Sequence, residues 1–319
     1  MKIYNWGIIS PGKIAHKFAE GMKVISNANL YAVASSSQER ADAFAQQYSV
    51  EKAYNSYLDL VQDSNVDVIY IASTNNFHFE HAKLCLEHGK ACLCEKPFTL
   101  NSAQLQELIQ IARKNNVFLM EALWTMFLPS ISVVGKLIAN KSIGEITSMK
   151  IDFGFQVPYN EDSRLFSPEL GGGALLDIGL YPLFLALHLL GEPKSLQASA
   201  VRTNKGVDIS DSIVLQYDSN VKVLLEATFA EDLPCEAKIV GTTGTIIMHR
   251  MWHCPTKITL ENEKGIEDCT PEYIGNGYNY EIVEVQKCIE NNRLESDKMS
   301  LQFSSILMSY LDKIGEISQ

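Results

Sequence analysis

Through residue 121 the chain alternates between short apolar segments and segments of helical period, and this alternation constrains the fold most strongly. The apolar segments have the composition of buried strands and lie at Ile3–Ile9, Leu30–Ala34, Val66–Ile71, Ala91–Glu95 and Val117–Glu121. Strands that alternate with helices in this way form a doubly wound parallel sheet. We therefore predict that residues 1–122 fold as one α/β domain.

The turn between the first strand and the first helix carries a degenerate dinucleotide-binding fingerprint. The pattern G-x-G-x-x-[GA] is met with Ser10, Gly12 and Ala15 at its three fixed positions. Gly12 lets the backbone approach a pyrophosphate, and the helix N-terminus offers N–H groups to it. The turn Ser10-Pro11-Gly12-Lys13-Ile14 thus predicts the cofactor site of a Rossmann domain, with an ordinary strand–helix turn as the alternative.

The end of the second strand bears on the choice of cofactor. Ser35, Ser36 and Ser37 follow the strand, and Arg40 lies one turn into the next helix. NAD-specific domains usually place Asp or Glu here to hold the ribose 2′-hydroxyl, whereas hydroxyls with a nearby Arg suit a 2′-phosphate. Ser35, Ser36 and Arg40 therefore predict NADP(H) over NAD(H), although a helix cap at Ser37 also explains a serine there.

The stretch from Ala91 to Pro97 ends a buried strand with two opposite charges and a proline. Proline has no N–H to donate, so it ends the hydrogen-bonded ladder. Ligands of open α/β sheets bind beyond the carboxyl ends of the strands, and Glu95 and Lys96 are expected at that edge. The alternative is a solvated ion pair before a turn proline.

After about residue 125 the pattern changes to long strands, which lie at 145–156, 195–202, 209–217, 221–229, 237–240 and 244–248. Runs of strands with few helices between them indicate a mainly antiparallel sheet. We predict a second domain, residues 123–319, of α+β class with a large open sheet for substrate binding and oligomerisation. Two C-terminal helices, near Asn279–Glu290 and Ser300–Ile314, are expected to pack back on the first domain.

The composition of the chain limits the classes of partner that it can bind. The chain of 319 residues has a formal net charge of −11 and no long basic run, which disfavours nucleic acid and anionic membranes as partners. Seven scattered cysteines without a C-x-x-C pair, and an N-terminus without a signal-peptide pattern, predict a reduced cytoplasmic protein. The histidines share no metal-ligand spacing with carboxylates, so we predict no metal site.

Six blocks of the chain carry a family resemblance. They are Trp6–Ile14, Cys94–Pro97, Glu121–Pro129, Arg164–Phe166, Gly171–Pro182 and Gly277–Ile282. With these blocks the chain resembles the glucose–fructose oxidoreductase/inositol dehydrogenase (Gfo/Idh/MocA) family, and within it the branch of dimeric dihydrodiol dehydrogenases and NADP-dependent xylose dehydrogenases. The resemblance implies a Rossmann domain, a second domain on an open antiparallel sheet, and hydride transfer between NAD(P) and a carbon of a sugar, polyol or trans-dihydrodiol.

The resemblance also implies roles for individual residues. The family's catalytic lysine maps to Lys96, its acid–base position to Tyr181, and the aspartate of the same motif to Asp177. Positions on the cofactor side of the family site fall on Ser73, Thr74, Asn75, His78, Glu95, Lys96 and Trp124. Met126 stands where this branch usually has Arg in a W-T-R-F block, and this departure bears on the identity of the substrate.

The chemistry of hydride transfer fits these residues. Tyr181 can exchange the hydroxyl proton if its pKa, about 10 in free solution, is lowered, and a nearby Lys96 ammonium would lower it. Asp177 precedes Tyr181 by one helical turn, so both could bind neighbouring substrate hydroxyls. Arg164 is either a further substrate contact or half of a surface ion pair, His78 either a cofactor contact or a helix-end residue, and Tyr181 itself otherwise a core tyrosine.

Two further expectations follow. The second-domain sheet has two faces, and the few helices can cover one of them, so we predict a homodimer or a dimer of dimers. The function predicted is that of an NAD(P)-dependent dehydrogenase or reductase acting on CH–OH groups. The alternative is a sensor or scaffold of the same fold that binds NADP(H) or a sugar without turnover, although such a protein could have lost Lys96 or Tyr181.

Overall fold

The structure, a computed structural model, describes residues 2–318, with the backbone only at Ser219. The chain forms two compact units. The first runs to Phe127 and also takes Ile274–Met308, and the second comprises Leu128–Tyr273 and the residues from Ser309 onward. The predicted domain boundary after residue 122 stays a prediction, because a division into compact units does not by itself define domains.

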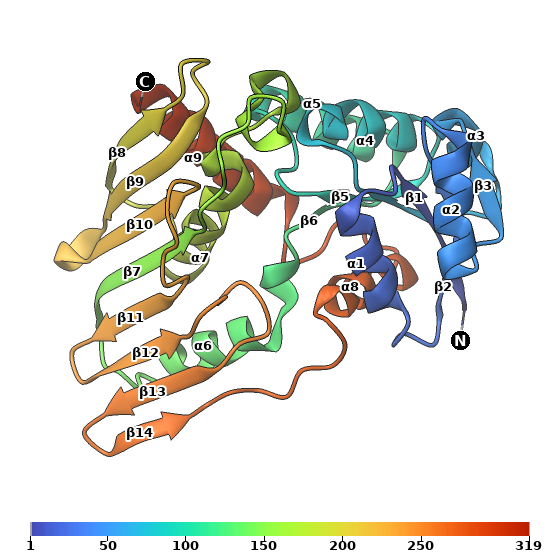
Figure 1. Cartoon of the computed structure of the whole chain (residues 1–319). Helices are drawn as coiled ribbons and strands as arrows, with labels where there is room; N and C mark the ends of the chain where they lie inside the picture. Colours follow the sequence, from blue (N-terminus) through green and yellow to red (C-terminus); the bar gives the residue numbers. More distant parts are fainter. Residues whose placement is uncertain (1, 319) are drawn as a thin grey trace. The chain divides into compact units, whose positions relative to one another are not determined.

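The first unit is built on a six-stranded parallel sheet in the order β3-β2-β1-β4-β5-β6 (Figure 1). Its strands are β1 (Tyr4–Ile9), β2 (Ala28–Ala34), β3 (Lys52–Tyr54), β4 (Val68–Ile71), β5 (Ala91–Glu95) and β6 (Leu119–Ala122). The helices between them are α1 (Lys13–Met22), α2 (Gln38–Tyr48), α3 (Tyr57–Gln62), α4 (His78–Glu87) and α5 (Ser102–Asn115). The strand order reverses between β1 and β4, which is where sheets of this type bind ligands.

Local sequence accounts for the helix boundaries in this unit. Ser37, Ser56 and Asn101 each accept a hydrogen bond from a backbone N–H in the first turn of α2, α3 and α5. Ser49 and Asn116 end α2 and α5 in the left-handed conformation that closes many helices. Each of these capping residues lies next to the helix terminus that it stabilises, so short stretches of sequence are enough to predict them.

The segment Ile274–Met308 completes the first unit. Its helix α8 (Tyr278–Glu290) packs on α1, where a Cβ added to Gly21 would lie 2.7 Å from the Cβ of Tyr278. The backbone N–H of Leu119 on β6 donates to the carbonyl oxygen of Leu294, which occupies the otherwise open edge of the sheet. α9 (Leu301–Ile317) begins in this unit and ends in the second.

The second unit contains an eight-stranded sheet in the order β14-β13-β12-β11-β7-β10-β9-β8. Its strands are β7 (Ile146–Gly154), β8 (Ser195–Arg202), β9 (Asp208–Gln216), β10 (Lys222–Thr228), β11 (Ala237–Gly241), β12 (Gly244–Met248), β13 (Ile258–Asn262) and β14 (Gly265–Asp268). Every neighbouring pair is antiparallel except β7 and β10. The predicted fold class, a doubly wound parallel sheet with a mainly antiparallel second sheet, is confirmed.

Helices of the second unit are fewer. They are α6 (Pro129–Ala139), which the sequence analysis missed, and α7 (Leu180–Leu190), which lies against β7 and β10. The short 3-10 segments of the chain are η1 (Asn75–Phe77), η2 (Trp124–Phe127), η3 (Arg164–Phe166), η4 (Pro168–Leu170) and η6 (Asp218–Asn220). The segment η5 (Leu175–Gly179) before α7 is a π-helix, a form that is rare and frequent at functional sites.

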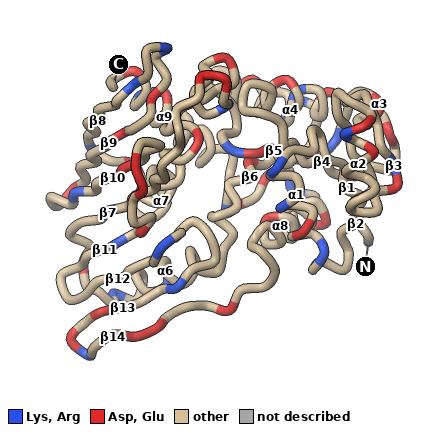
Figure 2. The backbone as a smooth tube through the Cα atoms, viewed as in Figure 1, with Lys and Arg blue, Asp and Glu red and all other residues tan. Residues whose placement is uncertain are grey.

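Charged residues are interspersed in both units. Figure 2 shows Lys and Arg scattered among Asp and Glu along the described elements, without one element lined by basic residues alone. This distribution agrees with the acidic net charge of −11.

Candidate active site

The turn from β1 to α1 has the geometry that a dinucleotide fingerprint requires. Ser10 adopts a left-handed conformation (φ +64°), which explains why glycine is usual at this first position, and its Oγ lies 2.9 Å from the hydroxyl of Tyr57. Gly12 is the N-cap of α1, and no side chain there accepts from the first-turn N–H groups. A Cβ at Gly12 would meet only two backbone oxygens, the nearer being that of Ala72 at 3.7 Å. Uncapped N–H groups beside open space fit a pyrophosphate.

The residues predicted to determine the preference for NADP(H) or NAD(H) fall into two groups. Ser36 and Arg40 are exposed where β2 ends and α2 begins. Ser35 is buried, and its Oγ accepts from the backbone N–H of Ser37 at 3.4 Å. Ser37 caps α2 by accepting from the N–H of Arg40. Ser35 therefore shapes the turn, and Ser36 and Arg40 are the two side chains with room to meet a ribose phosphate.

The loop after β4 is tied to the turn after β5. The two ring nitrogens of His78 lie 2.7 Å from the carbonyl oxygen of Pro97 and 3.0 Å from that of Ser73. Ser73 also places its Oγ 3.0 Å from Nδ1 of His81. Thr74 donates to the side-chain oxygen of Asn76, and Asn75 is buried. His78 thus links two loops at the carboxyl edge of the sheet, while its contact with a cofactor stays a prediction.

Lys96 stands at the carboxyl end of β5, followed by a cis bond to Pro97. The buried Glu95 carboxylate accepts from the hydroxyl of Tyr70 on β4 and from the backbone N–H of Lys96. Two residues after Lys96, the N–H of Phe98 donates to Oε1 of Glu121 at 3.2 Å. Lys96, itself half-buried, is therefore carried on a turn fixed by two buried glutamates.

Buried acids gather behind this turn. Oε2 of Glu121 accepts from the hydroxyl of Ser304 at 2.8 Å, and burial raises the pKa of Glu121 to about 7. Glu281 on α8 has no exposed surface, and neither of its oxygens has a hydrogen-bond partner among the described residues. Burial, and after it the charge of Glu95, holds the pKa of Glu281 well above its usual range. Burial therefore favours the protonated, neutral form of this carboxyl.

An aromatic layer lines the same unit. The ring of Trp124 stacks on that of Tyr278 with their centroids 4.6 Å apart. Tyr70, which bonds Glu95, stacks on Phe18 at 3.7 Å. Because these rings are buried, they hold the strands and α8 at a fixed spacing behind Lys96. The sequence analysis named Trp124 but missed its partner Tyr278.

The second unit carries the predicted substrate residues. Arg164 donates from Nη1 to Oδ1 of Asp177 at 3.1 Å, so the two form an ion pair that is partly exposed on the arginine side. Asp177 lies within the π segment and Tyr181 in the first turn of α7. The sequence pattern predicted one continuous α-helix here, whereas the wider π turn changes the direction in which the two side chains leave it.

Tyr181 lies among aromatic rings of its own unit. The centroid of its ring is 5.6 Å from that of Phe153 and 5.3 Å from that of His253, and these last two stack at 4.0 Å. The sequence analysis considered His253 only as a metal ligand and so missed it. Its position after Trp252, in the turn between β12 and β13, gives no local signal of its neighbours.

Two general features bear on the site. Within residues 2–318, no three His, Cys, Asp or Glu side chains are grouped so that they could hold a metal ion. One described helical stretch, Pro168–Leu190, is long and apolar enough to cross a membrane by length and composition, and 72% of its apolar window is buried inside the structure. The mostly buried core helix of a protein passes the same test.

Two family models match the chain and identify its class. The model described as "Oxidoreductase family, NAD-binding Rossmann fold" matches residues 4–123, and that of the "GFO/IDH/MocA C-terminal domain" matches residues 131–247. The chain therefore belongs to the GFO/IDH/MocA family. It is an NAD(P)-binding oxidoreductase that acts on CH–OH groups.

Curated relatives cover nearly the whole chain. It is 38% identical to the trans-1,2-dihydrobenzene-1,2-diol dehydrogenase of Xenopus tropicalis over 97% of this chain and 96% of that protein. It is 32% identical to the human protein of the same name, over 97% of this chain and 95% of that one. The predicted resemblance to the family and to this branch is confirmed.

Solved structures share the fold. An aldose-aldose oxidoreductase from Caulobacter crescentus, complexed with glycerol, superposes with a TM-score of 0.89 at 19% identity, over 99% of this chain and 98% of that one. A 3-ketoreductase from Actinomadura kijaniata, in complex with NADP and TDP-benzene, has a TM-score of 0.86 at 23% identity, over 98% and 97%. At these identities the likeness extends to the fold alone.

Proposed function

We propose that the protein transfers a hydride between NADP(H) and a hydroxyl or carbonyl carbon of a sugar, polyol or trans-dihydrodiol. The full-length relatives are named as dehydrogenases of a dihydrodiol, and a sugar oxidoreductase shares the fold. The observation that carries the proposal lies in the two units themselves. Lys96 directly follows the buried strand β5 and donates its N–H to the buried Glu95, and Tyr181 lies in the first turn of the buried helix α7.

Cofactor binding falls to the first unit. The uncapped start of α1 and the space beside Gly12 fit the pyrophosphate. Ser36 and Arg40, with no acidic side chain among Ser35–Ser37, fit a 2′-phosphate and favour NADP(H) over NAD(H). When bound, the nicotinamide accepts or gives the hydride. His78, Asn75, Thr74 and Trp124 remain proposed contacts on the cofactor side.

Proton exchange falls to Lys96 and Tyr181. We take the hydroxyl of Tyr181 to accept the substrate proton during oxidation and to return it during reduction. A lysine ammonium near that hydroxyl favours the tyrosinate form and stabilises a developing alkoxide. Asp177, oriented by Arg164, would bind a neighbouring hydroxyl of the same substrate. This arrangement selects substrates that carry two adjacent oxygens, as diols and sugars do.

A homodimer is proposed through the second-unit sheet. One face of that sheet is covered by α7 and the π segment, which lie against β7, β9 and β10. The opposite side chains include Val201 on β8, 59% exposed, and Leu224 on β10, 38% exposed. Apolar side chains on a broad uncovered sheet mark an interface, and a second copy presents the same face.

The seven free thiols suit the reducing cytoplasm, which remains our prediction for the location of the protein.

The experiment that tests the mechanism is a double-mutant cycle. Lys96→Met and Tyr181→Phe should each lower kcat on the order of 10²- to 10⁴-fold, the usual scale for lost acid–base catalysis. If the two groups act as one unit, the double variant should be scarcely worse than either single variant. Rates are followed by nicotinamide absorbance, with a panel of sugars, polyols and trans-dihydrodiols as substrates.

A matched control is Tyr217→Phe. It removes a buried hydroxyl of the same unit, one that donates to the carbonyl oxygen of Gly191, and it should leave kcat near the wild-type value. NADPH binding should survive Tyr181→Phe, because that residue belongs to the second unit. Single losses that simply multiply, or a near-normal kcat in Tyr181→Phe, would make Tyr181 a core tyrosine and assign the proton to another group.

A further inference from the structure

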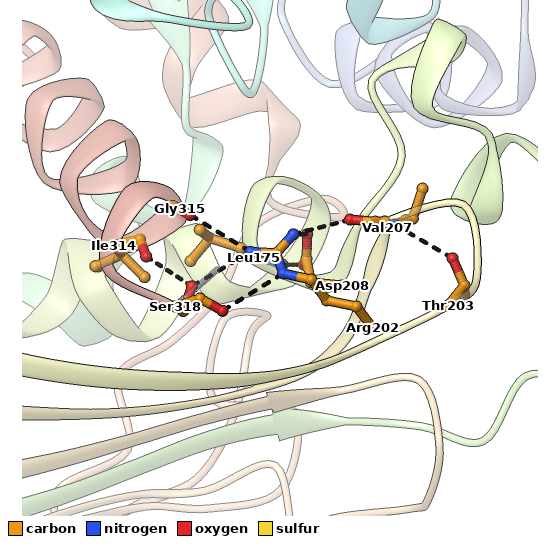
Figure 3. Close-up of polar contacts among 9 residues, drawn as sticks. Leu175, Arg202, Thr203, Val207, Asp208, Ile314, Gly315 and Ser318 are labelled. Atoms are coloured by element: carbon orange, nitrogen blue, oxygen red, sulfur yellow. Dashed lines mark hydrogen bonds and ion pairs between the residues drawn. The ribbon is translucent and has the colours of Figure 1, made fainter.

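The start of the π segment is held by a carboxylate from the sheet. Oδ2 of Asp208, the first residue of β9, accepts from the backbone N–H of Leu175 at 2.7 Å (Figure 3). The segment that begins at Leu175 carries Asp177 and leads directly to Tyr181. Its own N-cap residue, Ala174, makes no side-chain cap. Asp208 therefore supplies, from 33 residues away, the acceptor that a local serine or aspartate usually provides.

The glycine run is shaped around this contact. Gly173 has a positive φ of +127°, and a Cβ there would lie 2.5 Å from Oδ1 of Asp208. A Cβ at Gly172 would lie 2.6 Å from the carbonyl oxygen of Arg164. A side chain at either position would push the segment away from Asp208 or from the loop of Arg164. The glycines thus allow the backbone to pass closely between these two groups.

Arg202 lies on the other side of Asp208. Its Nη1 is 3.9 Å from Oδ1 of Asp208 and donates to the carbonyl oxygen of Gly206 at 2.9 Å. The same guanidinium donates to the backbone oxygens of Gly315 and Ser318 at the end of α9, as Figure 3 shows. A guanidinium fixed by several carbonyl oxygens presents a permanent positive charge beside Asp208.

A second acid, Asp211, lies three residues further along β9. It is 2% exposed, and neither of its oxygens has a hydrogen-bond partner among the described residues. Its neighbour across the sheet on β10 is Ala227, whose Cβ would lie 3.3 Å from a Cβ built on Gly179, the last residue of the π segment. Asp211 is therefore buried beneath the same segment whose start Asp208 holds.

The charges that act on Asp211 come from two strands. Burial, and after it the Asp208 carboxylate on the same strand, raises the pKa of Asp211 to about 9, against the opposing effect of Arg202 on β8. Its neighbours Ala200 and Ala227 carry no charge, and the π segment presents Gly179. Asp211 is therefore neutral at pH 7.

We propose that Asp208 is a positioning residue for the substrate side of the active site. Its carboxylate accepts from the N–H of Leu175 and fixes the first turn of the π segment, so that Asp177 and Tyr181 are presented in a single arrangement. The proposal rests on the proposed function in taking Tyr181 and Asp177 as substrate-side residues. Asp208 acts through the backbone of Leu175 and touches neither substrate nor cofactor.

The test compares two isosteric changes on one strand. Asp208→Asn removes the charge that holds Leu175, whereas Asp211→Asn replaces a neutral acid with a neutral amide. At pH 7 Asp208→Asn should lower kcat about tenfold, which is the size expected from the loss of one charge-assisted hydrogen bond. Asp211→Asn should leave kcat within about twofold of the wild-type value. NADPH affinity, a property of the first unit, should stay within about twofold in both variants.

Hydrogen exchange separates this proposal from the proposed function. Peptides that cover residues 173–181 should exchange faster in Asp208→Asn than in the wild type, and at the wild-type rate in Asp211→Asn. These measurements need no turnover, so they stand even if Tyr181 proves not to be catalytic.

Two results would overturn the proposal. One is unchanged exchange and kcat in Asp208→Asn, and the other is equal damage at pH 7 from both variants. If Asp208→Asn does not fold, Asp208→Glu is measured instead, because it keeps the charge but displaces the carboxylate by one methylene. It should then show faster exchange over residues 173–181 and a lower kcat with an unchanged NADPH affinity, and wild-type values for all three would again overturn the proposal.

Discussion

The buried Glu121 makes a quantitative prediction about stability and pH. Burial raises the pKa of its carboxyl from the ordinary 4.5 to about 7 in the folded protein. The folded state therefore holds a proton that the unfolded chain releases between these values. The contribution to stability is fully present below pH 4.5 and is lost as pH rises through 7, at about 1.4 kcal/mol for each pH unit between the two pKa values.

Glu121→Gln should remove this dependence. A neutral amide can still accept from the N–H of Phe98 and donate to the hydroxyl of Ser304, so it imitates the protonated acid. The free energy of unfolding of the wild type, minus that of Glu121→Gln, should fall by about 2.5 kcal/mol between pH 5 and pH 8, which follows from integrating the two titrations. Urea unfolding of both proteins at four pH values measures this difference.

A control variant with the opposite sign is available on α8. At Glu284 burial acts to raise the pKa, but hydrogen bonds from Ser296 and Lys298 outweigh it and lower the pKa below the usual value. Its contribution is present at neutral pH and is lost as pH falls. The difference between wild type and Glu284→Gln should therefore rise with pH. A pH-independent difference for Glu121→Gln would refute the conclusion that this acid is held neutral.

Three further predictions concern the cofactor and the assembly. Ser36→Asp should weaken NADPH binding and favour NADH, because the new carboxylate repels a 2′-phosphate; a wild type that binds both cofactors equally well would contradict the serine argument. Gly12→Ala should leave the melting temperature within about 2 °C, since a Cβ there would meet no protein atom closer than 3.7 Å, yet raise the Kd for NADPH about tenfold if the pyrophosphate passes over it. Light scattering at micromolar concentration should give at least twice the monomer mass of 35.6 kDa, and a monomer mass would exclude the proposed interface.

Several features of the site were readable from short stretches of sequence. A helix cap at Ser37 was expected and is present, because a cap depends on a side chain two or three residues from the N–H group that donates to it. The strand Ala91–Glu95 was expected with the bounds that it has, since apolar composition and the following proline define it. Ser10 was recognised at a fingerprint position, but the left-handed backbone that explains it needed the structure.

Features that depend on residues far apart in the chain could not be predicted from the sequence. Glu281 is one of two acids among the buried residues of α8, a signal that was present but whose meaning required the position of Glu95. His253 lies beside Tyr181 although 72 residues separate them along the chain. No periodic pattern connects such residues. Hydrophobic periodicity predicts which face of a helix or strand is buried, but not which distant side chains contact that face.

The sequence by itself determined the alternation of strands and helices, the helix caps, the fingerprint turn and the chemical identity of Lys96, Asp177 and Tyr181, because each follows from residues within one or two turns. Only the tertiary structure decided the π turn at Leu175–Gly179, the raised pKa of Glu121 and the support of Leu175 by Asp208. The physical reason is that the free energy of a buried charge or of an unusual turn depends on which groups surround it, and those groups come from strands and helices far apart in the chain.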